Sequence, residues 1–179
     1  MKMPVFERYI AELIEKSTIE VPVWNIEKAR GNGKGAGWNY VDGCMILAML
    51  EIYQVTGEKE YYDFADAFID YRVAEDGTIA GYHVEEYNID SVNAGKTLFA
   101  LYALNGKEKY RKAIDLIYSQ IQTQPRTEEG NFWHKKIYPN QVWLDGLYMG
   151  QPFYMEYETK FNGKKNYQDI FDQFSNVVK

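Results

Sequence analysis

The sequence has few of the residues that build disulfide frameworks or metal clusters. It contains one cysteine and two histidines in 179 residues. A single thiol cannot form an intramolecular disulfide, and so few soft ligands make a cysteine–histidine metal site improbable on composition. Cys44 lies inside the apolar run 44–50, where we expect a buried structural thiol.

Positive charge and long apolar runs are also scarce. The formal net charge is −6 and the pI is near 5.0, which argues against a nucleic-acid partner because phosphate binding needs clustered Lys and Arg. No apolar stretch approaches the roughly 20 residues that span a bilayer, and the first residues do not resemble a signal peptide. We therefore expect no membrane partner and, by default, a cytoplasmic location.

Aromatic residues are plentiful. They make up 16% of the chain, within a hydrophobic total of 46% that is typical of a folded globular protein. Aromatic rings can line a groove that binds a sugar ring, or they can fill a helical core. Composition alone favours the core.

Helical periodicity recurs along the chain. It predicts seven helices, at residues 3–16, 41–55, 60–71, 91–104, 108–122, 145–161 and 166–178. Three pairs of these helices are joined by a glycine turn, and a tyrosine follows each glycine by four positions (Gly57/Tyr61, Gly106/Tyr110 and Gly163/Tyr167). Such a repeat predicts stacked αα-hairpins in a single all-α domain over 1–179, as an open solenoid or a closed toroid.

The connections between successive hairpins, 75–90 and 127–145, are long and aromatic. Connections of this length usually carry function. Each ends at the same side of the predicted repeat and delivers an aspartate there, Asp90 and Asp145. Either aspartate could instead be only the N-cap of its helix. The glycine cluster 31–37 lacks the strand and the Gly-Lys-Ser/Thr ending of a phosphate loop, and we expect a mobile connection.

Asp145 has the surroundings expected of a catalytic carboxyl. It lies between Trp143 and an apolar helical run, shortly after a loop that contains His134. Aromatic walls around it would desolvate its ionised form and raise its pKa, which suits a general acid and base near neutral pH.

Four segments together resemble a known family. They are Trp143 to Phe153, Phe132 to His134, Asn88 to Lys96 and Gly37 to Tyr40. They are similar to the unsaturated glycuronyl hydrolases of glycoside hydrolase families 88 and 105, and the glycine spacing favours the unsaturated rhamnogalacturonyl hydrolases of family 105. The resemblance covers nearly the whole chain.

The resemblance implies an (α/α)6 barrel that acts on the unsaturated oligosaccharides released by polysaccharide lyases, with no metal or organic cofactor. It implies that Asp145 is the general acid and base, protonating C4 of the C4–C5 double bond and then deprotonating the water that adds at C5. Asp90 would be the second carboxylate, sharing a proton with it. His134 would bind sugar hydroxyls or the water. The predicted apolar and ring-stacking wall consists of Trp38, Tyr40, Trp143 and Met149.

A complete (α/α)6 barrel has twelve helices and needs roughly twice this length. The sequence therefore predicts half of a barrel with an open flank. The chain could be a truncation, a half-barrel that pairs with a second copy, or a partial chain without activity. A non-catalytic helical-repeat module that binds carbohydrate or protein is the alternative function. An epimerase on the same barrel is disfavoured because such enzymes usually need a histidine base.

Four further residues receive structural roles. We expect His83, Trp24 and Trp133 to be structural or packing residues, and Lys96 to pair with a nearby acid.

Overall fold

The computed structural model describes residues 5–25 and 37–178 and is all-helical. Its helices are α1 (Val5–Glu15), α3 (Tyr40–Thr56), α4 (Lys59–Asp70), α5 (Ile89–Asn105), α6 (Glu108–Thr123), α7 (Leu144–Phe161) and α8 (Tyr167–Ser175), with short 3₁₀ helices at Val84–Glu86 and Asn176–Val178. Each lies where the periodicity predicts it. Within these ranges the only strand-like pairing is two isolated bridges, Val73 with Ile79 and Arg126 with Phe132.

The predicted hairpins are α3–α4, α5–α6 and α7–α8. The turn glycines have left-handed backbone angles, with φ of 73° at Gly57, 67° at Gly106 and 62° at Gly163. Glycine adopts this conformation without the steric cost that a Cβ would add. The tyrosines that follow the first two turns are buried, and the Tyr110 hydroxyl donates to Asp66 Oδ1 at 2.6 Å. The repeat read from the sequence is therefore a repeat in space.

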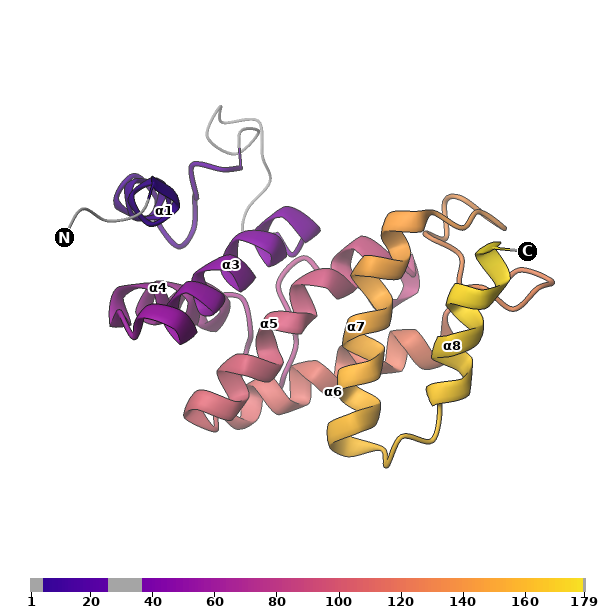
Figure 1. Ribbon diagram of the computed structural model, residues 1–179. Coiled ribbons are helices and arrows are strands. Elements are labelled where there is room, and N and C mark those ends of the chain that lie inside the picture. The colour runs from indigo at the N-terminus through magenta and orange to yellow at the C-terminus, as the bar shows by residue number, and fades with distance from the viewer. Residues whose placement is uncertain (1–4, 26–36, 179) are drawn as a thin grey trace.

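Helix α5 is the centre of the arrangement and packs against α3, α6 and α7 (Figure 1). The first helices of the three hairpins, α3, α5 and α7, form one row, and each packs against the second helix of its own hairpin, α4, α6 or α8. The α3–α5 contact is close because Gly43 has no side chain: a Cβ there would lie 2.6 Å from the Ala94 Cα. This is the arrangement of a partial (α/α)6 barrel.

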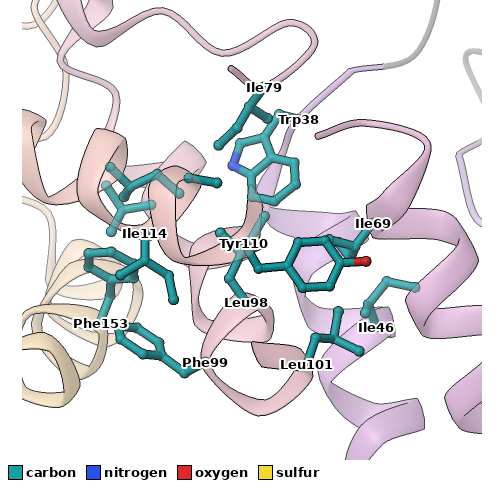
Figure 2. Close-up of a cluster of buried hydrophobic side chains, with 14 of the residues drawn as sticks. Trp38, Ile46, Ile69, Ile79, Leu98, Phe99, Leu101, Tyr110, Ile114 and Phe153 are labelled. Carbon is teal, nitrogen blue, oxygen red and sulfur yellow. The ribbon is translucent and has the colours of Figure 1, made fainter. Parts of the chain in front are cut away.

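The core fills the space between the first and second helices of the hairpins (Figure 2). It combines aliphatic side chains such as Ile46, Leu98 and Ile114 with the ring pair Phe99 and Phe153, whose centroids lie 5.1 Å apart. Trp24 packs at its edge, 5.9 Å from the Phe68 ring, which confirms its packing role.

Two sequence predictions about polar residues are wrong in detail. Cys44 is only half-buried, and the Asn93 side-chain amide lies 3.4 Å from its sulfur. Lys96 is buried, but within 5–25 and 37–178 no acid pairs with it; its Nζ donates to the Tyr148 carbonyl at 3.2 Å and lies 3.9 Å from that ring's centroid. Burial lowers the Lys96 pKa. The glycine segment 31–35 lies outside the described residues.

Candidate active site

The two aspartates lie at the starts of adjacent helices, α5 and α7, which begin at the same end of the molecule (Figure 1). Their first turns touch: a Cβ placed on Gly146 would lie 3.7 Å from the Ile89 Cγ2. Neither aspartate is an N-cap. Asn88 caps α5 and accepts the Asp90 backbone N–H at 3.1 Å, while Trp143 precedes α7 without a side-chain cap. The capping interpretation is therefore wrong for both.

Asp90 is held by two cations or potential cations. Its Oδ2 lies 2.5 Å from Lys135 Nζ, and its Oδ1 lies 3.1 Å from His134 Nε2. The histidine contact is close, but it does not have the geometry of a well-aligned hydrogen bond. Burial of Asp90 favours the neutral acid, but Lys135 and His134 outweigh it and hold the pKa of the carboxyl below its ordinary value. Asp90 is therefore an anion at neutral pH.

His134 is fixed by its backbone and by its ring. Its carbonyl accepts the Ile89 N–H at 3.0 Å and its N–H donates to the Gln141 carbonyl at 2.8 Å, so the loop is bonded to the start of α5. Its imidazole stacks on the Trp143 indole at 4.2 Å between centroids and 12° between planes. Tyr138 stacks on the same indole at 5.2 Å. His134 is only 2% exposed.

Asp145 lies in different surroundings from those expected. Its side chain is exposed, so the described residues do not enclose it in aromatic walls. His134 lies beside its neighbour: a Cβ on Gly146 would be 3.0 Å from His134 Nδ1. The histidine thus lies between the first turns of the two helices that carry the aspartates.

The four residues of the predicted apolar wall divide into two pairs. Tyr40 and Trp143 are 43% and 39% exposed, so part of each side chain is accessible to a ligand. Trp38 and Met149 are 5% and 7% exposed, and the Trp38 indole N–H donates to the Ser91 carbonyl at 2.8 Å. Figure 2 shows Trp38 within the hydrophobic cluster. Their burial argues against the wall role for Trp38 and Met149.

Lys135, whose ammonium contacts Asp90, was not predicted from the sequence. Its position next to His134, in a long connection of the kind that usually carries function, could have indicated it. A groove of about 380 Å³ adjoins it, lined by Glu85, Glu86, Asn88, Lys135, Lys136 and Ile137. His83, expected to be structural, is exposed in the preceding connection.

The described ranges contain no cluster of three or more His, Cys, Asp or Glu side chains suited to a metal ion. The helices of the same ranges are too short or too polar for any of them to cross a bilayer.

The fold is that of a partial helical barrel, with aspartates in the first turns of two adjacent helices. The family model for Glycosyl Hydrolase Family 88 matches residues 12–179, and the chain belongs to that family. A similar solved structure is a glycoside hydrolase of family 105 from C. acetobutylicum ATCC 824, with 40% sequence identity and a TM-score of 0.81. The match covers 96% of this chain and 44% of that one, so this chain spans less than half of its relative's length.

Proposed function

We propose that this chain forms one half of the active site of a hydrolase for unsaturated uronyl oligosaccharides, of the unsaturated rhamnogalacturonyl hydrolase type. The observation that carries the proposal is the unequal pair of aspartates at the starts of α5 and α7. Asp90 is held as an anion, whereas Asp145 is exposed and can exchange protons with a bound molecule. Membership of family 88 supports a glycoside hydrolase of this kind.

The proposed reaction uses the two protonation states of Asp145. As an acid it donates a proton to C4 of the C4–C5 double bond, and as a carboxylate it then removes a proton from the water whose oxygen bonds to C5. Water is thus added across the double bond and Asp145 regains its proton. The hemiketal at C5 opens and releases the next sugar. No bond to the enzyme forms, so the spacing of the carboxylates does not set a stereochemical outcome as in ordinary glycosidases.

Asp90 has a supporting role in this scheme. Because Lys135 and His134 hold Asp90 ionised, Asp90 and Asp145 would not share a proton. This differs from what the family resemblance implies. Asp90 would then supply a fixed negative charge at the same end of the molecule as Asp145. Trp143, stacked on His134 and 39% exposed, would contribute its exposed part as an apolar contact for the sugar.

The proposal is tested by the absorbance of the conjugated double bond. Lyase-generated oligosaccharides are mixed with the chain, and the absorbance is expected to fall as water adds. Asp145→Asn is expected to remove this activity, by about 10²–10⁴-fold as is usual for a general acid or base, with the fold intact by circular dichroism. A wild-type chain that binds the sugar without changing its absorbance would instead support the non-catalytic binding module.

We further propose that other helices cover the open flank when the enzyme is active. The flank exposes apolar side chains of the last hairpin: Leu144 is 72%, Tyr148 58% and Phe171 64% exposed. Apolar surface of this kind is usually covered in a stable protein. The occupant is the remaining half of a longer chain, since the family 105 relative is more than twice as long as the matched segment. Light scattering distinguishes this from self-pairing: a monomer supports it, and a dimer whose interface buries Phe171 overturns it.

A further inference from the structure

A small cavity lies beside His134. Its volume is about 10 Å³, measured as the space open to the centre of a water molecule, which is about what one water requires. It is lined by Ile89, Phe132, His134, Val142, Trp143, Gly146, Leu147, Gln151 and Gln173. Most of this lining is apolar.

Three buried polar atoms of the lining residues have no hydrogen bond within the part of the chain that the structure describes: Nδ1 and Nε2 of His134 and Oε1 of Gln151. Nε2 still lies 3.1 Å from Asp90 Oδ1, so Nδ1 and Oε1 are the two that also have no ion-pair contact. The residues are 2% and 3% exposed. Buried polar groups in folded proteins are nearly always paired, with protein or with ordered water.

The other polar side chains around the cavity are already engaged. Gln173 donates its amide to the Gly130 carbonyl at 3.0 Å and accepts the Phe132 N–H at 2.9 Å. The Trp143 indole N–H donates to Gln141 at 3.0 Å. None of these groups is available to His134 Nδ1.

The chemistry of the two unpaired atoms identifies what fills the space. Asp90 is ionised, so it can only accept, and the ring nitrogen that faces it, Nε2 of His134, must carry the proton. In the neutral ring Nδ1 is then an acceptor. Gln151 Oε1 is an acceptor as well, so the two atoms cannot bond to each other. A water molecule, with two hydrogens to donate, satisfies both.

We propose that one buried water bridges His134 Nδ1 and Gln151 Oε1, and that Gln151 thereby acts as a positioning residue for the imidazole that contacts Asp90. The water fixes the tautomer with the proton on Nε2, toward Asp90, and the stack on Trp143 fixes the plane of the ring. Hydrogen bonds to the far nitrogen of a functional histidine set its tautomer and orientation in the same way. The catalytic consequence rests on the proposed function; the water itself does not.

The first test is direct. A high-resolution crystal structure of the chain is expected to show one ordered water within hydrogen-bond distance of both atoms. In Gln151→Met, which keeps the length of the side chain and removes the acceptor, the water is expected to be lost. An empty cavity in the wild type, or a Gln151 amide nitrogen bonded straight to Nδ1, overturns the inference.

The second test is spectroscopic and needs no substrate. The chain has only two histidines, so His83→Gln assigns the His134 resonances by elimination. With ¹⁵N labelling, the neutral ring is expected to carry its proton on Nε2, and Nδ1 is expected to show the upfield shift of an acceptor that receives a hydrogen bond. In Gln151→Met the Nδ1 resonance moves downfield. An unchanged spectrum overturns the inference.

Tyr154→Phe is the matched control, because it removes one polar group from the same helix. The Tyr154 hydroxyl donates to Asp169 at 3.1 Å and does not line the cavity, so the His134 resonances are expected to stay in place. The outcomes separate the two proposals. A chain with the water in place but no activity on unsaturated oligosaccharides refutes the proposed function alone. An active chain with a dry cavity refutes this inference alone. If the chain is active and the water is in place, Gln151→Met is expected to lower kcat and to leave KM unchanged.

Discussion

The starts of α5 and α7 occupy equivalent places in two successive hairpins, yet they hold their aspartates differently. At the start of α5, Asp90 has a side chain 16% exposed and contacts Lys135 and His134. At the start of α7, Asp145 is exposed and has no ion-pair or hydrogen-bond partner within 5–25 and 37–178. The repeat thus places two carboxyls at one end of the molecule and gives them different surroundings.

The difference shows how one repeat supplies two chemical roles. The connection before α7 folds back over the start of α5, where the His134 carbonyl accepts the Ile89 N–H. The Lys135 and His134 side chains of this connection contact the Asp90 carboxylate. Among the described residues no comparable segment covers Asp145, which is exposed. The difference between the two aspartates therefore comes from the connection that folds over the start of α5.

The largest effect is expected in the unfolding free energy when each aspartate is replaced by asparagine. Asp90→Asn removes the negative charge that contacts Lys135 and His134 and leaves one acceptor oxygen in place of two. It is expected to cost about 2–3 kcal/mol of unfolding free energy, since a hydrogen bond to a charged group is worth about 1.5–3 kcal/mol in net terms. Asp145→Asn, at an exposed site, is expected to change it by less than about 0.5 kcal/mol. Urea unfolding of both variants measures the contrast. Equal costs would contradict it.

The same contrast has a pH dependence. The pKa of Asp90 is lowered on folding, so its ionised form stabilises the fold at pH values above the unfolded pKa of about 4 and this contribution is lost as pH falls through the folded value. The gap in stability between wild type and Asp90→Asn is therefore expected at pH 5 and is expected to close toward pH 3. Urea unfolding at both pH values tests it. A gap that widens on acidification would show that Asp90 is not held as an anion.

Much of this arrangement could be predicted from the sequence, because it depends on local patterns. The glycine turns and the apolar periodicity set the hairpins, and the two long connections deliver Asp90 and Asp145 to one end. The environments could not be predicted, since they depend on packing between distant segments. The reach of Lys135 to Asp90 and the burial of Trp38 against Ser91 are fixed by how α3, α5 and the loop before α7 meet. Nothing in the local sequence encodes either contact.

A smaller effect is expected from the glycines at the start of α7. A Cβ on Gly146 would lie 3.0 Å from His134 Nδ1, and that ring is confined between Trp143 and Asp90. A Cβ on Gly150 would lie 3.4 Å from Ile89 Cγ2, an ordinary contact. Gly146→Ala is therefore expected to be about 1–2 kcal/mol less stable than Gly150→Ala, because crowding offsets the gain in helix propensity. Thermal unfolding compares the two. Equal stability would mean that His134 can move freely.

The smallest effect is expected from the lysine that distinguishes the start of α5. Lys135→Met removes one charge contact of Asp90, and Lys136→Met is the matched control because the Lys136 ammonium lies 5.9 Å from the Tyr87 ring centroid and not on Asp90. The first variant is expected to cost about 0.5–1 kcal/mol, near the upper end for partly exposed ion pairs. It is also expected to move the Asp90 pKa up toward its ordinary value, because burial then acts against fewer favourable contacts. Carbon-13 NMR of the carboxyl group measures that shift. If the Asp90 pKa stays low without Lys135, His134 alone holds the anion, and the difference between the two aspartates comes from the histidine.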